Sequence, residues 1–115
     1  MASKSFGPTA AVADTKTTIG VAYQVPKGGR IQKIRVAAYN GVADKAGTAI
    51  LILETDRQKG PWEYAVQFMQ GLTDVYPVPT AVIDCNIPVS QGEIVTVSLT
   101  ASEALEDVIV SITWA

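Results

Sequence analysis

Short stretches of alternating apolar and polar residues run through most of this sequence, and no window of ten or more residues has a helical period. The stretch 62–70 shows the alternation most clearly, because Trp62, Tyr64, Val66 and Phe68 occupy every second position. Val, Ile and Thr, whose branched side chains suit a pleated sheet, account for 35 of the 115 residues, whereas Leu accounts for five. We therefore expect an all-β protein.

The alternating stretches are separated by turn-forming residues such as Pro and Gly, which punctuate β proteins. The pattern predicts strands at residues 17–25, 30–39, 48–55, 62–70, 80–87, 93–100 and 108–114. Such a series of short strands is typical of an antiparallel β-sandwich or barrel, here with seven to eight strands. The 48–55 stretch is apolar on both faces, with Ile50 and Ile52 opposite Leu51 and Leu53. It predicts a central strand that is covered on both sides, either by the rest of the fold or by a neighbouring subunit.

A chain of 115 residues is long enough for one domain but not for two. Residues 1–16 are small and polar and include Gly7 and Pro8, so we expect an N-terminal arm followed by a β-sandwich domain over residues 17–115. Residues 1–8 contain no apolar stretch of the kind that a signal peptide needs. No apolar run approaches the ~20 residues of a membrane-spanning helix.

The sequence contains no histidine and a single cysteine, so the commonest general base and the commonest metal ligands are scarce. We therefore expect no enzyme activity, no metal and no cofactor. Cys85 is in step with Ala81, Ile83 and Ile87 and is expected to be a buried structural thiol. A small enzyme that uses paired carboxylates is a third hypothesis, although no spacing singles out a pair. Its candidate residues are Asp84, Glu93, Glu103, Glu106 and Asp107.

Charge is distributed unevenly along the chain. Residues 1–59 hold all nine basic residues and four acids, a net charge of +5, whereas residues 60–115 hold seven acids and no base, a net charge of −7. The two halves either interleave in the sandwich or give a polar molecule whose copies attract head-to-tail. The basic patch candidates are Lys27, Arg30, Lys33 and Arg35. We do not expect nucleic acid as a partner, because the cluster is short, the pI is about 4.9 and only Tyr39 interleaves as an aromatic residue.

The segment 87–97 (IPVSQGEIVTV), together with the short strands and the arm, resembles single jelly-roll proteins of viral shells and surface layers. The resemblance implies a structural protein whose arms and strand edges make the subunit contacts, with copies of itself and other shell proteins as partners, in a virion or in the cytoplasm. We accordingly expect a self-assembling capsid, capsid-decoration or filament protein. Since aromatic residues dominate contact energies, the interface candidates are Phe6, Pro8, Trp62, Tyr76 and Trp114.

The same segment also resembles carbohydrate-binding sandwich modules, which gives an alternative function. Trp62, Tyr64 and Phe68 lie on one face of a predicted strand, where they form either part of the core or an exposed aromatic platform for sugar rings. The two functions differ in what they require, because a sugar platform needs exposed rings and no large oligomer.

Overall fold

The computed structural model describes residues 2–39, 46–57, 60–69 and 81–115, and these ranges contain nine β-strands and no helix. The strands are β1 (Ala2–Ala11), β2 (Thr17–Thr18), β3 (Tyr23–Gln24), β4 (Gly29–Tyr39), β5 (Ala46–Thr55), β6 (Trp62–Met69), β7 (Ala81–Val89), β8 (Ile94–Ala101) and β9 (Leu105–Trp114). Six of them overlap the stretches predicted between residues 30 and 114.

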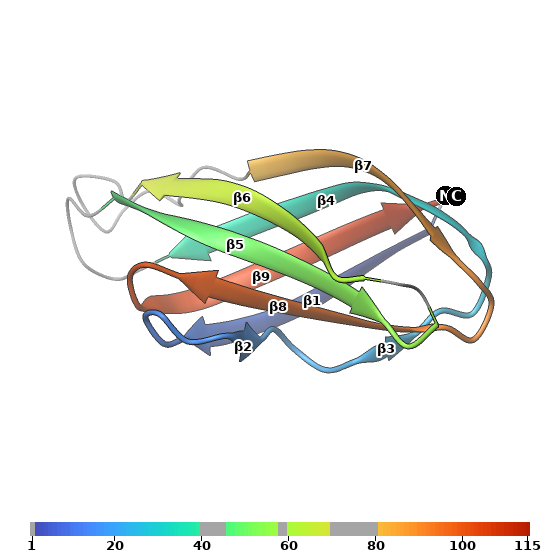
Figure 1. Cartoon of the computed structure of the whole chain (residues 1–115), viewed down its shortest axis with the longest axis horizontal. Coiled ribbons are helices and arrows are strands. Elements are labelled where there is room, and N and C mark those ends of the chain that lie inside the picture. The colour runs from blue at the N-terminus through green and yellow to red at the C-terminus, as the bar shows by residue number, and fades with distance from the viewer. Residues whose placement is uncertain (1, 40–45, 58–59, 70–80) are drawn as a thin grey trace.

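The strands form two antiparallel sheets that pack face to face (Figure 1). Sheet A has the strand order β1-β9-β4-β7, and sheet B has the order β2-β8-β5-β6, with β3 also paired to β8. This order is that of a jelly roll in which β2 and β3 together take the place of one strand. The predicted all-β antiparallel sandwich is therefore confirmed, with nine strands instead of seven to eight. Across the part of the chain that the structure describes, no helix is long and apolar enough to cross a membrane.

The core lies between the two sheets and is built from alternate residues of their central strands. Sheet A contributes Val110 and Ile112 from β9, and sheet B contributes Leu51 from β5 and Leu99 from β8, all fully buried. Burying a side chain of this size stabilises the fold by roughly 1.5–3 kcal/mol. The inward-facing residues of these strands thus supply most of the apolar surface that holds the layers together.

The N-terminal segment is a strand and not the arm that we expected. β1 pairs with β9 from Ala2↔Trp114 to Ala11↔Leu105, and Phe6 and Ala11 belong to the buried core. The alternation is weak because most residues of β1 are small or polar, and Pro8 interrupts it. What holds the segment is a partner strand whose paired residues lie 94 to 112 positions away in sequence, which local pattern does not reveal.

The predicted strand 17–25 is divided into β2 and β3. Gly20 lies between them with φ of +68°, a left-handed conformation that ends the extended backbone. The alternation is interrupted next to this glycine: Ile19 and Val25 are buried as expected, whereas Val21 is 78% exposed.

Candidate interaction site

Two of the five predicted interface residues lie in the protein's own core. Phe6 is 2% exposed, and its ring meets the ring of Tyr23 edge-on at 6.4 Å. Trp114 is 3% exposed, lies 6.1 Å from the same Tyr23 ring, and donates a hydrogen bond of 3.1 Å from Nε1 to the carbonyl oxygen of Lys27. The prediction that Phe6 and Trp114 are interface anchors is therefore corrected: both rings hold β1, β3 and β9 together.

The other predicted aromatic contacts are less accessible than a binding platform requires. Trp62 and Tyr64 are half-buried and pack against the core, so these two rings do not form an exposed strip. Pro8 is exposed on β1. Tyr76 and the side chain of Phe68 lie outside the described residues. Nothing in this arrangement favours the sugar-binding alternative.

The four basic patch candidates follow β4 and the turn before it. Arg30 donates from Nη1 to Oδ1 of Asn86 at 3.2 Å, and the Lys33 ammonium lies 3.9 Å from a carboxylate oxygen of Asp84. Arg35 lies opposite Ser111 of β9 and is exposed, whereas Lys27 lies in the turn that precedes β4. Because Asp84 on β7 offsets part of this charge, the four residues form a mixed polar surface and not a concentrated cationic patch. The side chain of Tyr39, the interleaved aromatic, lies outside the described residues.

Cys85 is half-buried on β7, and its thiol donates to the carbonyl oxygen of Ile31 at 3.4 Å. Burial raises the pKa of this thiol, and the negative charge of Asp84 raises it further. The pKa of Tyr64 on β6 is likewise raised by burial and, to a smaller extent, by Cys85. A thiol with a raised pKa remains protonated at neutral pH and is a poor nucleophile. Among the described residues, no three metal-binding side chains come together.

Glu93, one of the five candidate carboxylates, is fully buried in the turn between β7 and β8. Its Oε1 accepts a hydrogen bond of 2.7 Å from the backbone N–H of Ser90, whereas Oε2 has no partner. The carboxylate therefore braces the turn that connects sheet A to sheet B. The sequence pattern did not distinguish this residue from the exposed acids.

The outer face of sheet B carries apolar side chains at its centre. Ile50 is 45% exposed there, and its cross-strand neighbours are Thr100 on β8 and Ala65 on β6. Ile52 lies two positions along the same strand, between Ser98 on β8 and Glu63 on β6, and both Ile52 (8% exposed) and Ser98 (2% exposed) are buried. We call Ile50, Ile52, Ala65, Ser98 and Thr100 the sheet B patch. Charged side chains lie at its margin, where the Lys16–Glu54 ion pair (2.8 Å) and Glu63 are found.

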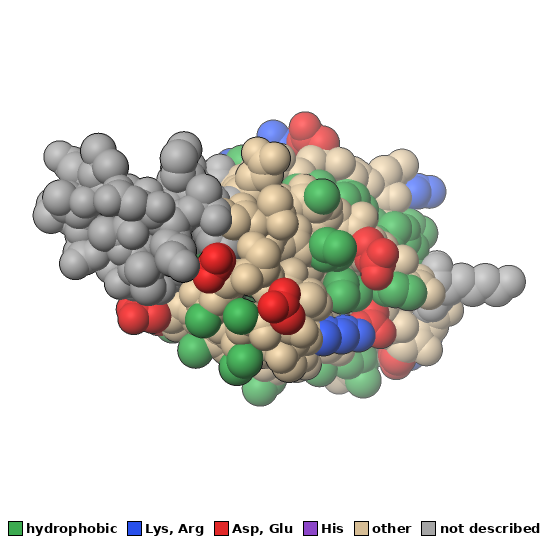
Figure 2. Space-filling view, turned by 60° about the vertical axis from the view of Figure 1, so that its left-hand side comes forward, with side chains coloured by type: hydrophobic (Ala, Val, Ile, Leu, Met, Phe, Trp, Pro, Cys, Tyr) green, Lys and Arg blue, Asp and Glu red, His purple; other side chains and the backbone are tan. Residues whose placement is uncertain are grey.

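The outer face of sheet A carries more charged and hydroxyl side chains, although Val82 on β7 and Ile109 on β9 are 48% and 39% exposed there. Arg35 and Lys33 project from β4 beside Ser111 and Thr113 of β9, and Ser111 exchanges a hydrogen bond of 2.9 Å with Ser5 of β1. Figure 2, a view from one end and side, shows hydrophobic side chains that reach the surface in several small groups with acidic side chains between them. The sequence signal for the sheet B patch was the two-sided apolar character of residues 48–55.

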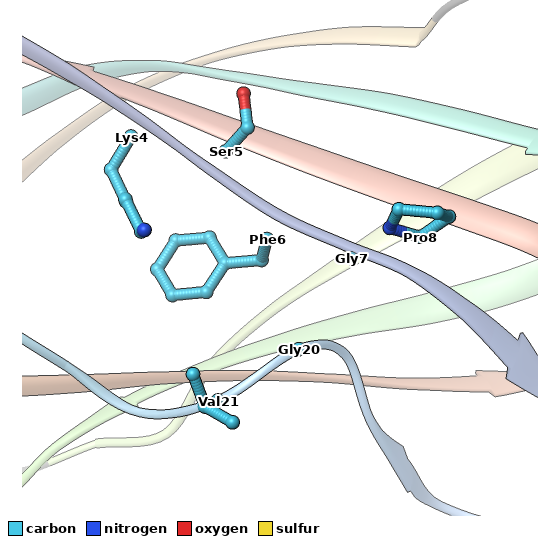
Figure 3. A pocket seen from close by; sticks show the side chains of 7 residues that line it. All are labelled: Lys4, Ser5, Phe6, Gly7, Pro8, Gly20 and Val21. Carbon is cyan, nitrogen blue, oxygen red and sulfur yellow. The ribbon is translucent and has the colours of Figure 1, made fainter.

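A small open pocket of about 230 Å³ lies between β1 and the segment around Gly20 (Figure 3). Its walls include Phe6, Pro8 and Val21, and Lys4 is the one titratable residue that lines it. The Lys4 ammonium lies 5.1 Å from the centre of the Tyr23 ring, a distance suited to a cation–π contact. The pocket thus offers no pair of groups that would carry out acid–base or nucleophilic chemistry.

Comparison with known proteins adds support for the fold. No model of a protein family matches the chain, and no curated protein matches it either. A solved structure of Eiger TNF from S. frugiperda is similar over 98% of this chain and 92% of that chain, with 11% sequence identity and a TM-score of 0.50. At this identity the similarity concerns the fold alone, and it agrees with the two-layer sandwich described above.

Proposed function

We propose that this protein is a non-catalytic structural subunit that assembles with copies of itself, as a capsid, capsid-decoration or filament protein does. The observation that supports the proposal is the sheet B patch, and above all Ile50. In an antiparallel sandwich, one face of each sheet packs on the core and the other usually carries polar residues. On β5 two of the outward positions are instead occupied by isoleucines, Ile50 at 45% exposed and Ile52 at 8% exposed.

A second copy of this chain is a suitable occupant because the centre of the patch is uncharged. In a two-fold contact each residue near the axis faces its own counterpart, so a central charge would meet a like charge. Ile50, Ala65 and Thr100 avoid this repulsion, while the charges of Glu54 and Glu63 lie at the margin. Burial of the exposed part of Ile50 would add apolar contact at no such cost.

The absence of catalysis is part of the proposal. It is supported by the lack of histidine in the sequence and by the raised pKa of the Cys85 thiol. The mixed Lys33, Arg35 and Asp84 surface on sheet A would then remain available for other shell proteins. A virion is the setting that the capsid form of this proposal implies.

The test compares two isoleucine substitutions by light scattering across a range of protein concentrations. Ile50 and Ile109 both lie on central strands, both point outward, and are 45% and 39% exposed. We expect the wild type to exceed its monomer mass of 12.2 kDa, Ile50→Lys to weaken association at least tenfold, and Ile109→Lys to leave it unchanged. A wild type that stays monomeric at every concentration, or two variants with equal effects, would refute the proposal.

A further inference from the structure

The four outer edges of the two sheets differ in how well they are protected from pairing with another chain. An exposed strand edge offers unpaired N–H and C=O groups, and proteins block such edges with prolines, bulges, charges or very short strands. In sheet A, β1 contains Pro8, and its register with β9 shifts between Phe6 and Thr9 and again between Thr9 and Ala11. Pairing along the outer edge of β1 is therefore interrupted near its middle.

The remaining edge of sheet A and one edge of sheet B are also protected. β7 contains Pro88, and its register with β4 shifts between Ile31 and Lys33, which indicates a bulge. On the other sheet, β2 and β3 have two residues each, too few to template a partner strand. Three of the four edges thus carry at least one blocking feature.

The fourth edge, β6, carries no proline and no bulge, and it is not a very short strand. It has eight residues, contains no proline, and pairs with β5 in an unbroken register from Ala46↔Met69 to Leu53↔Trp62. Its single charge is Glu63, near one end. Within the described residues no strand pairs with its outer side.

We propose that β6 pairs antiparallel with β6 of a second copy, so that the two B sheets form one continuous sheet. The inference rests on the proposed self-association and adds to the contact through the sheet B patch a second contact along a strand edge. Main-chain hydrogen bonds would supply the attraction, as in strand addition generally. The sheet B patch borders this edge through Ala65, so the joined sheet would also bring the apolar areas of two copies onto one surface.

The alternation of side chains limits the register of this pairing. Opposed residues must point to the same face, so the two-fold axis must pass through a residue and not between two residues. With the axis at Ala65, the small side chain of Ala65 opposes itself and Glu63 opposes Gln67. This register avoids a like-charge contact and places a carboxylate beside an amide that can donate to it.

Disulfide trapping tests both the pairing and the register. In a Cys85→Ser background, single cysteines replace the exposed residues Ala65 or Gln67. Directly opposed residues of antiparallel strands have Cα atoms roughly 4.5–5.5 Å apart, within the range of a disulfide. In the proposed register two copies of position 67 are four residues apart along the strand, roughly 13 Å. We expect Ala65→Cys to form covalent dimers under mild oxidation at least tenfold faster than Gln67→Cys.

A mixing experiment provides a second measurement that does not depend on Ala65. Glu63→Cys and Gln67→Cys proteins, each slow to cross-link alone, should cross-link to each other when combined. Equal rates for all variants, or no dimer from Ala65→Cys and none from the mixture, would overturn the inference. If that happened while Ile50→Lys still weakened association, self-association would stand and only the β6 contact would be lost. Face-to-face packing of two sheets, at a spacing of about 10 Å, is too distant to give these disulfides.

Discussion

Sheet A carries Lys33, Arg35 and Asp84 on its outer face, beside the partly exposed side chains of Val82 and Ile109. On sheet B the row around Ile50 is uncharged, because its cross-strand neighbours are Ala65 and Thr100. Both edges of sheet A are interrupted by a proline and a register shift, but sheet B ends in the uninterrupted strand β6. The inner faces do not differ in this way, because both are fully buried and apolar. The comparison shows that one alternating pattern can build a stable layer on either side of a core and still leave two chemically different outer surfaces.

The largest effects should come from the inner faces, and they should be equal. Leu51 on sheet B and Ile112 on sheet A are both 0% exposed. Replacing either with Ala removes buried methyl groups and leaves a cavity, so each should lower the free energy of unfolding by about 2–5 kcal/mol. Urea unfolding at low protein concentration in an Ile50→Lys background, where association is expected to be at least tenfold weaker, measures both. A large loss for one variant and almost none for the other would show that the sheets do not share the core evenly.

A smaller effect is expected at Glu93, in the turn that joins the two sheets. Glu93→Ala removes the acceptor of the Ser90 N–H and should cost about 1–3 kcal/mol of unfolding free energy. Glu93→Gln keeps both an oxygen for that bond and the volume of the side chain, so it should cost less. The ratio of the two losses in unfolding free energy, from the same urea titration, separates the contribution of the Ser90–Glu93 hydrogen bond from that of the volume that the side chain fills. If Gln were as damaging as Ala, the bond would not be the source of the stability.

The smallest effect on stability concerns Cys85 at the β7 edge of sheet A. Burial and the charge of Asp84 raise the pKa of the thiol above its ordinary value of 9.0, so alkylation by iodoacetamide should be slow at neutral pH. Because the folded-state pKa is the higher one, the stability contributed by the protonated thiol is complete below pH 9 and is lost as the pH rises through the raised value. Asp84→Asn removes the smaller cause and should moderately increase the alkylation rate at a given pH. Alkylation as fast as that of a free thiol would contradict the half-buried, hydrogen-bonded position of Cys85 on β7.

Most of the fold follows from local pattern, as β4, β5 and β6 illustrate. Their alternating β-branched and aromatic residues lie between clear turn signals, and the structure ends each of them within about two residues of the predicted limit. β1 was missed because its side chains are mostly small and its pairing with β9 is a contact between the two ends of the chain. The order of strands within each sheet is also a long-range property, and residue spacing does not contain it.

The candidate site was less accessible to sequence reasoning. Large aromatic residues are good core residues as well as good interface residues, and Phe6 and Trp114 proved to belong to the core. Ile50 was visible in the sequence as part of a stretch that is apolar on both faces, but its exposure became clear only with the sheets assembled. Whether the outer edge of β6 is free to pair depends on which strands lie beside it in the sheet, and the residues of β6 alone do not predict this.

Gly7 and Gly20 bring the backbones of β1 and the β2–β3 connection into direct contact. A Cβ atom on Gly20 would lie 2.8 Å from the backbone nitrogen of Gly7, so no larger residue fits there without moving one of the segments. This close approach ties the layers along one long margin, which leaves the opposite margin, formed by β6 and β7, as the place where they would first separate. Amide protons along β6 and β7 should consequently exchange with heavy water before those of β1, and a neighbour bound at β6 would slow that exchange.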